Sequence, residues 1–298
     1  MWLKTNSLNS EPAIIPKSTF TPPKVQFLKW VGSKHKFASE MVQFFPDEFK
    51  IYHEPFLGSG SILATLAPDI GYASDIYPPL IEIWQTLKEN PTEVINWYEA
   101  RYNKFSSGDR KEQYESIKAD FNNRPNGPDF LFLTRACWGG VIRFRKLDGY
   151  MSTPVGWHEP INVASFTLRV NEWHNRIKNV TFNCEDYKES FNRASAGDLI
   201  YCDPPYQNSQ SILYGSQRFD FSELLECIAN AKQRGIYVAM SIDGHSRSGV
   251  IQENLKIPLG IFEREIDINN RISMLLRFKK VGQKLTTERD TEKLFLTY

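Results

Sequence analysis

Short apolar runs alternate with segments of helical periodicity in the first and last thirds of the chain. Each run is bounded by Gly, Pro, Asp or Asn, which is typical of strands. The predicted strands lie at 50–55, 71–75, 180–184, 198–202, 236–242, 261–266, 272–278 and 293–297. The predicted helices lie at 34–45, 61–67, 79–87 and 221–233. Strands that alternate with helices predict a parallel sheet with crossover helices, and hence a doubly wound α/β fold.

The alternation stops in the middle of the chain, where residues 89–176 are helical, aromatic and basic. A hairpin is predicted at 143–153, and strands alternate with helices again only after it. The pattern therefore predicts one α/β domain, made of 25–88 and 177–298, interrupted by a mainly helical inserted domain at 89–176. Residues 1–24 are polar and dotted with prolines, and we expect them to form an N-terminal arm.

The composition narrows the classes of protein to which the chain can belong. Its 298 residues are 41% hydrophobic and 24% charged, as in water-soluble globular proteins. No segment approaches the roughly 18 apolar residues of a membrane span, and the N-terminus lacks an apolar signal core. The four cysteines and five histidines have no metal-ligand spacing, which favours reduced thiols, a cytoplasmic location and no metal site.

The net charge is +1, so any surface that binds a polyanion must be local. Residues 101–147 carry ten Lys or Arg against five Asp or Glu, and 135–146 has four basic residues and no acid. A second acid-free segment, 268–287, carries five basic residues. Each segment alone fits a solvated face as well as it fits phosphate binding. Together, and beside the motif described next, they favour phosphate contacts.

The predicted strand at 198–202 ends in Asp203-Pro204-Pro205-Tyr206, which has the chemistry to bind a nucleobase amine. The Asp203 carboxylate and the Pro204 carbonyl are two acceptors for the two hydrogens of an exocyclic amino group. The prolines stiffen the turn and add no N–H donor, and Tyr206 offers a face on which a base can stack. Open α/β sheets bind ligands at the carboxyl ends of their strands. The motif therefore indicates methylation of a base amine that has left its helix.

A glycine turn, Gly58-Ser59-Gly60, follows the first predicted strand. Glycines let the backbone approach a ligand closely and expose the N–H groups at the start of the next helix. Leu63 stands where a dinucleotide fingerprint needs a third glycine, which disfavours NAD and FAD. Asp75, at the end of the second strand, is placed to bind ribose hydroxyls. The turn and this carboxylate together predict a nucleoside cofactor.

Four segments occur in an order that resembles a known protein family. They are FLKWVGSK at 27–34, EPFLGSG at 54–60, Asp75, and DPPY at 203–206. In this order they resemble the Dam-like, adenine-specific DNA methyltransferases, the class with a recognition domain inserted between the cofactor motifs and the catalytic motif. The resemblance extends from about residue 26 to the C-terminus.

The resemblance implies a Rossmann-like methyltransferase sheet with an inserted target-recognition domain, S-adenosylmethionine as methyl donor, and duplex DNA as substrate. It places the catalytic residues at Asp203, Pro204, Pro205 and Tyr206. The residues expected to contact the cofactor are Trp30, Lys34, Pro55, Phe56, Gly58, Ser59, Gly60, Asp75, Asp186 and Asp203. Asp186 follows the strand after which this family holds the cofactor adenine, and Glu185 is an equal candidate.

The segment 135–156 resembles the family's recognition hairpin. We expect Arg135, Arg143, Arg145 and Lys146 to contact DNA, either pairing with guanine or binding phosphates. Arg145 and the Trp-Gly pair at 138–139 differ from what members that read GATC would show. The sequence therefore predicts a DNA target without naming it.

Several alternatives stay open on the sequence alone. The same two acceptors could hold the exocyclic (N4) amine of cytosine, and RNA or a protein amide could be the substrate. A DNA-binding homologue without catalytic activity is a further alternative. An active enzyme would be a bacterial or phage protein, either solitary or paired with a cognate restriction endonuclease. We expect it to be a monomer in the cytoplasm, associated with the nucleoid.

Overall fold

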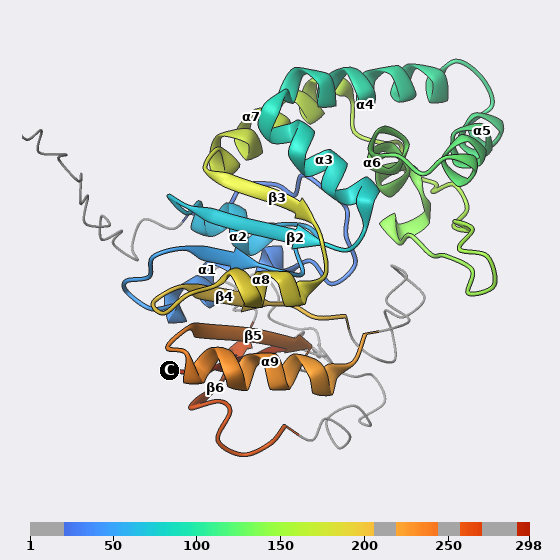
Figure 1. Ribbon diagram of the computed structural model, residues 1–298. Helices are drawn as coiled ribbons and strands as arrows, with labels where there is room; N and C mark the ends of the chain where they lie inside the picture. The colour runs from blue at the N-terminus through green and yellow to red at the C-terminus, as the bar shows by residue number, and fades with distance from the viewer. Residues whose placement is uncertain (1–20, 206–218, 244–256, 270–290) are drawn as a thin grey trace, which may run out of the picture.

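The strands form one mixed sheet with helices on both faces (Figure 1). The computed structural model describes residues 21–205, 219–243, 257–269 and 291–298. The strand order is β3-β2-β1-β4-β5-β7-β6; β1 to β5 are parallel, and β7 is antiparallel to both of its neighbours. The strands are β1 Tyr52–Glu54, β2 Gly71–Asp75, β3 Val180–Cys184, β4 Leu199–Cys202, β5 Tyr237–Asp243, β6 Arg264–Asn269 and β7 Thr291–Leu296.

The helices fall into three groups along the chain. The first group is η2 Lys34–Lys36, α1 Ala38–Met41, η3 Val42–Phe44, α2 Ser61–Leu66 and α3 Pro78–Glu89. The second is α4 Pro91–Ser106, α5 Arg110–Asn123, α6 Gly127–Ala136, η4 Trp138–Gly140 and α7 Val163–Ile177. The third is α8 Tyr187–Arg193 and α9 Phe221–Gln233.

Side chains of the sheet alternate between two apolar clusters, one on each face. In β4, Leu199 and Tyr201 pack with α1, α2, α3 and α7, whereas Ile200 and Cys202 pack with α8 and α9. All four residues are at most 1% exposed, so both faces of the strand are covered. This is the pattern of a doubly wound sheet, in which successive residues of a buried strand point to opposite helix layers. The predicted fold class is confirmed.

The strand order places a site at one edge of the sheet. The chain runs outward from β1 through β2 to β3 and then returns to place β4 on the other side of β1. The carboxyl ends of β1 and β4 therefore face a crevice at the point where the winding reverses, which is where doubly wound folds bind ligands. Both sequence motifs lie there, since the glycine turn follows β1 and Asp203 follows β4.

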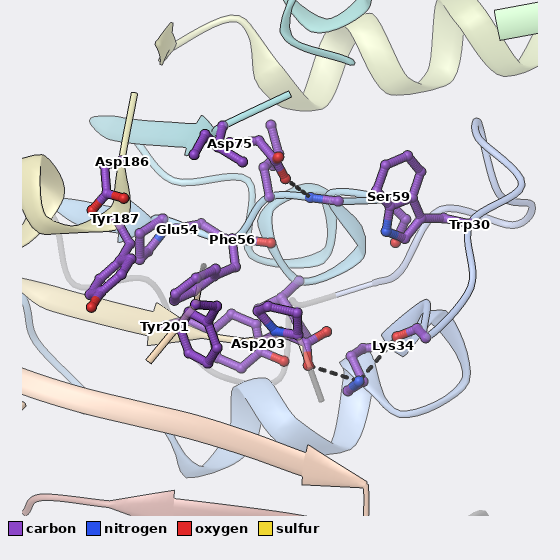
Figure 2. A pocket seen from close by; sticks show the side chains of 18 of the residues that line it. Trp30, Lys34, Glu54, Phe56, Ser59, Asp75, Asp186, Tyr187, Tyr201 and Asp203 are labelled. Carbon is purple, nitrogen blue, oxygen red and sulfur yellow. Dashed lines mark hydrogen bonds and ion pairs between the residues drawn. The ribbon is translucent and has the colours of Figure 1, made fainter. Parts of the chain in front are cut away.

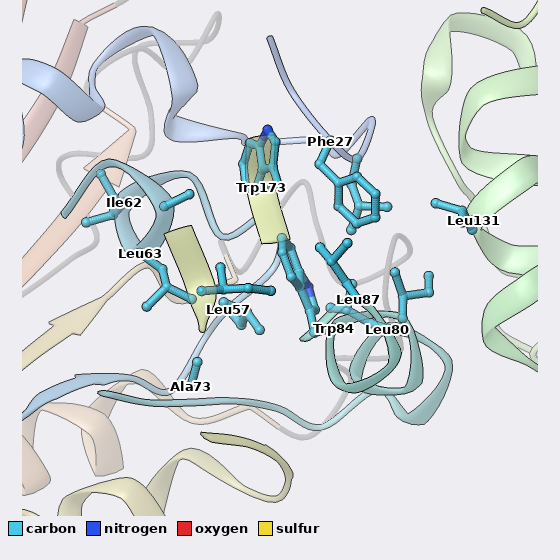
Figure 3. Close-up of a cluster of buried hydrophobic side chains, with 14 of the residues drawn as sticks. Phe27, Leu57, Ile62, Leu63, Ala73, Leu80, Trp84, Leu87, Leu131 and Trp173 are labelled. Carbon is cyan, nitrogen blue, oxygen red and sulfur yellow. The ribbon is translucent and has the colours of Figure 1, made fainter. Parts of the chain in front are cut away.

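Helices α4, α5 and α6 extend beyond the sheet (Figure 1), yet their apolar core is continuous with the sheet's. Trp84 of α3 packs between Phe27, at 5.5 Å between ring centroids, and Trp173 of α7, at 5.8 Å (Figure 3). The same cluster reaches Phe130 and Phe132 of α6. A continuous cluster of this kind holds α4, α5 and α6 rigidly on the sheet, and the proposed boundary of an inserted domain remains a prediction.

The sequence predicted most elements closely. β3 and α9 match residue for residue, and the hairpin is present as a single bridge between Phe144 and Met151. The predicted helix at 34–45 is wrong, since two 3-10 turns flank a single α-helical turn there. Helix α8 was not predicted. The predicted strand at 272–278 and most of the N-terminal arm lie outside the described residues.

Two predictions made from the composition, on the state of the cysteines and on membrane-spanning segments, can be compared with the structure. All four cysteines are free thiols. Within the described ranges, no helix is long and apolar enough to cross a membrane.

Candidate active site

Two glycines shape the turn between β1 and α2. Gly58 and Gly60 have φ values of +46° and +60°, in the left-handed region that favours glycine. A Cβ at Gly58 would lie 2.7 Å from Trp30 Nε1, so this indole packs directly against the turn. On the other side, the Asp75 carboxylate accepts hydrogen bonds from Gly58 N at 3.2 Å and Tyr77 N at 3.1 Å. The turn is thus held from both sides in one conformation.

Burial raises the pKa of two carboxyl groups beside this turn. Glu54, only 2% exposed, accepts a 2.6 Å hydrogen bond from the Tyr52 hydroxyl. Burial raises the pKa of Glu54 to about 8, and the nearby Asp203 adds to the effect. Burial also raises the pKa of Asp75 to about 6, against the opposing effect of its backbone N–H donors. At neutral pH, Glu54 is therefore mostly protonated and Asp75 is mostly ionised.

Asp203 follows β4 and is held by donors from two other elements. Lys34 Nζ lies 2.9 Å from Asp203 Oδ1 (Figure 2). The Ser241 hydroxyl of β5 donates to the same oxygen at 3.1 Å. The Lys34 ammonium also donates to the Gly32 carbonyl at 3.0 Å and lies 3.6 Å from Glu292. Burial lowers the pKa of Lys34, but Asp203 and Glu292 outweigh that effect and raise it. Lys34 is therefore a permanent buried cation, 3% exposed.

A cavity of about 340 Å³ joins these groups into one site. Ten of the residues predicted to be catalytic or to bind the cofactor line it: Trp30, Lys34, Pro55, Phe56, Gly58, Ser59, Asp75, Asp186, Asp203 and Pro205. Gly60 and Pro204 do not line it; Gly60 begins α2 behind the turn, and Pro204 is buried. Tyr206 lies outside the described residues. Asp203 therefore faces the glycine-lined crevice, as the sequence argument required.

Aromatic rings form the far end of the cavity. Phe56 stacks on Tyr187 at 5.2 Å between centroids, and Phe219 meets Phe56 edge-on at 5.7 Å. Tyr187 is 7% exposed, and its hydroxyl has no hydrogen-bond partner among the described residues. Sequence reasoning missed Tyr187 and Phe219 because nothing in their local pattern marks them.

The two acidic candidates after β3 both line this end but differ in their partners. Glu185 forms a two-pronged ion pair with Arg193, with both contacts at 2.8 Å. Asp186 caps α8 by accepting from Lys188 N at 3.0 Å through Oδ1. Because a single N–H occupies Asp186 whereas a guanidinium holds both oxygens of Glu185, Asp186 is the better placed to accept a further hydrogen bond.

The four basic candidates separate into two groups. Arg143, Arg145 and Lys146 are exposed on the hairpin, where Arg145 forms a two-pronged ion pair with Asp148. Arg135 is directed inward instead. Its guanidinium donates to the carbonyls at 26–27, and burial lowers its pKa to about 10. These donors hold the N-terminal segment on α6, and the contact of Arg135 with DNA stays a prediction.

Comparison with known proteins identifies the family. The sequence model of the D12 class N6 adenine-specific DNA methyltransferases matches residues 30–265. The chain belongs to this family. The match spans the glycine turn, the helices α4 to α7 and the Asp203 turn, and it sets aside the cytosine, RNA and protein-amide alternatives.

Curated relatives agree with this adenine methyltransferase assignment. A DNA adenine methylase of Vibrio cholerae is 30% identical over 227 residues, 72% of this chain and 80% of that protein. The type II methyltransferase M.MjaIII of Methanocaldococcus jannaschii is 28% identical over 218 residues, 66% of this chain and 75% of that protein. The rRNA methyltransferase aviRa from Streptomyces viridochromogenes covers 88% of this chain and 81% of its own at 10% identity with a TM-score of 0.33, too low to carry an argument.

Proposed function

We propose that this adenine methyltransferase binds S-adenosylmethionine in the cavity between β1 and β4. We further propose that it methylates N6 of an adenine turned out of duplex DNA, with Asp203 as the acceptor that orients the amine. The observation that carries the proposal is the position of the Asp203 carboxylate, at the wall of a cavity that the glycine turn also lines.

The charge of the cavity suits a cationic ligand. Its lining includes seven carboxylates and two lysines: Glu54, Asp75, Glu185, Asp186, Asp203, Asp220, Glu223, Lys34 and Lys188. Ion pairs offset the charges of Glu185, Glu223 and Asp203, and Glu54 is mostly protonated at neutral pH. The charges of Asp75, Asp186 and Asp220 remain, which favours a sulfonium and disfavours a pyrophosphate.

The remaining lining fits the nucleoside half of the donor. Asp75 would accept from ribose hydroxyls, as the acid after the second strand does in related folds. Phe56 and Tyr187, which stack on each other, would offer the adenine an aromatic surface. The buried Tyr187 hydroxyl has no partner among the described residues, and a ligand atom could supply one. Asp186 would accept from the adenine amine. When bound, the donor supplies a methyl group attached to a positively charged sulfur.

The amine needs help because its lone pair is delocalised into the base. Asp203 and the Pro204 carbonyl, by accepting its two N–H bonds, favour a pyramidal nitrogen with a localised lone pair. Lys34 and Ser241 hold Oδ1 of Asp203, and we assign the carboxylate as the acceptor for the amine. Catalysis then rests on alignment and electrostatic stabilisation by groups already in place. Removing the base from the duplex costs a few kcal/mol, which stacking on Tyr206 would offset by about 1–3 kcal/mol.

The hairpin is the proposed reader of DNA sequence. Arg143, Arg145 and Lys146 are exposed there, and Leu147 at its tip is 95% exposed. Guanidinium groups at such a tip can pair bidentately with guanine or bind phosphates. Mapping the modified bases at every position of a plasmid that the enzyme has methylated would identify both the modified base and the sequence around it.

The test of the proposal is Asp203→Asn, with Asp203→Ala beside it. Methyl transfer from labelled S-adenosylmethionine to plasmid DNA should fall by about 10²–10³-fold or more, as when one oriented catalytic group is lost. Affinity for duplex DNA, measured by fluorescence anisotropy, should stay within about twofold. Wild-type turnover in both variants would refute the role of Asp203. If the wild-type protein does not bind S-adenosylmethionine in calorimetry, the proposed role of the cavity is refuted.

A further inference from the structure

A chain of buried hydroxyl groups leads from the protein interior to the reactive carboxylate. The Tyr201 hydroxyl lies 2.7 Å from Ser241 Oγ, and Ser241 Oγ donates to Asp203 Oδ1 at 3.1 Å. Ser241 is 0% exposed and Tyr201 is 1% exposed. Neither hydroxyl belongs to a sequence motif, and the mechanism described above does not require a proton from either.

We propose that Ser241 is a positioning residue for methyl transfer: its hydroxyl fixes the rotation of the Asp203 carboxylate, and Tyr201 fixes the direction of that hydroxyl. This inference rests on the proposed function, because it assumes that Asp203 orients the substrate amine. It assigns to β5 a part in a reaction whose other groups come from β1, β2, β4 and the segment before α1.

The sheet register makes the contact between Ser241 and Asp203 a property of the backbone. Cys202 of β4 pairs with Met240 of β5, so the next residues along the two strands, Asp203 and Ser241, are neighbours. Alternation along β5 turns Ser241 to the same face as Tyr201, opposite to Met240. Parallel strands in register hold such a pair without any flexible loop between the donor and the sheet.

The direction of each hydrogen follows from the donor count. A serine hydroxyl has one hydrogen, and Ser241 gives it to Asp203. The 2.7 Å contact must then be donated by Tyr201. Burial raises the pKa of Tyr201, and the charge of Asp203 raises it further, so the phenol keeps its proton and remains a donor.

The group beyond Tyr201 in this series of hydroxyl groups argues against proton transfer. Beyond the Tyr201 hydroxyl lies the sulfur of Met41, at 3.9 Å, which is only a weak acceptor. A path that ends at a thioether cannot deliver a proton to solvent or to a base. The arrangement therefore orients a carboxylate and does not carry protons.

Without Ser241, the donor to Oδ1 that the sheet holds in place is lost. Lys34 would keep its contact, but an ammonium is a point charge and does not fix the carboxylate plane. The carboxylate would then sample orientations that are unproductive for the amine. The loss should fall on the rate of transfer, because neither the donor site at the far end of the cavity nor the exposed hairpin changes.

The experiment compares Ser241→Ala, Ser241→Cys and Tyr201→Phe with Ser190→Ala as a matched control. Ser190 is also 0% exposed and shares a 3.0 Å hydroxyl contact with Ser74, away from Asp203. Single-turnover rates are measured with saturating donor and DNA, together with dissociation constants for both and melting temperatures.

We expect Ser241→Ala to lower the single-turnover rate about 10–100-fold, with both dissociation constants within about twofold of wild type. Ser241→Cys, which keeps a weak donor of similar size, should fall between Ala and wild type. Tyr201→Phe should lower the rate about 3–10-fold, and Ser190→Ala should leave it unchanged.

The outcomes separate the inference from the proposed function. A wild-type rate in Ser241→Ala, with Asp203→Asn inactive, overturns the inference alone. Full activity in both variants overturns the proposed function as well. A rate loss in Ser241→Ala that Ser190→Ala reproduces, or that follows melting temperature or donor affinity, shows a structural role and also overturns the inference.

Discussion

Replacing Glu54 by Gln tests whether the buried carboxyl group beside the glycine turn is protonated in the folded protein. The change keeps the shape of the side chain and an acceptor for the Tyr52 hydroxyl, which contacts Glu54 Oε2 at 2.6 Å. It removes the titration of a side chain that is 2% exposed and whose pKa burial raises from 4.5 to about 8.

The sign of the effect follows from proton binding. Between pH 4.5 and about 8, the folded protein holds a proton on Glu54 that the unfolded chain has released. The stability that this proton provides is fully present below about pH 4.5 and is lost as the pH rises through about 8. The full displacement corresponds to about 5 kcal/mol, so we expect a loss of about 2–5 kcal/mol across this window.

The assay is urea unfolding of both proteins at intervals from pH 5 to pH 9. The difference in unfolding free energy between wild type and Glu54→Gln should change steadily across the window, in favour of the variant at high pH. Glu48→Gln, the same chemical change at an exposed position, should follow wild type to within about 0.5 kcal/mol. Parallel curves for wild type and Glu54→Gln would refute the reasoning from burial.

Four further variants test the rest of the site, the hairpin and the contacts of α6. Gly58→Ala puts a Cβ 2.7 Å from Trp30 Nε1 at a positive φ, so it should cost about 1–3 kcal/mol in thermal melting and weaken donor binding in calorimetry. Lys34→Met removes a buried ammonium that faces Asp203 and Glu292 and should cost about 3–5 kcal/mol in urea unfolding; an unchanged midpoint would contradict this ion pair. Arg143→Ala should weaken binding to the mapped target by about 1–3 kcal/mol if it reads a base, whereas equal loss on random duplex would make it a phosphate contact. Arg135→Ala should lower melting temperature without a selective loss of DNA affinity, the reverse of the result expected for a DNA contact.

Most of the fold could be predicted because the local sequence of most elements shows their periodicity and their ends. β3 and α9 have clear periodicity and clear ends, and both match the prediction. Helix α8 spans only Tyr187–Arg193 and is largely polar, so no apolar stripe marked it. The segment at 34–45 has helical spacing, but the Phe37 φ of −107° interrupts it and its apolar residues pack in short turns instead.

The candidate site was predictable only where a motif carries it. The glycine turn, Asp75 and Asp203 could be found because each lies at, or shortly after, the carboxyl end of a strand. Ser241 and Glu292 come to Asp203 and Lys34 through strand pairing across long stretches of sequence, and no local signal marks them. The inward direction of Arg135 had no local signal either, because the backbone carbonyls that it binds lie more than 100 residues earlier.

The connection between β2 and β3 carries every residue from 76 to 179, including α4 to α6 and the hairpin. β3 is the edge strand of the sheet, next to β2, so this long connection begins and ends on one side of the sheet. It does not cross β4, which Asp203 follows, or β5, which contains Ser241. Changes confined to the exposed hairpin of this connection therefore leave the strands of the site in place, whereas Trp84 and Trp173 of the same connection belong to the core of the sheet. If the hairpin reads the DNA target, as proposed, its residues can change without moving Asp203 or Ser241.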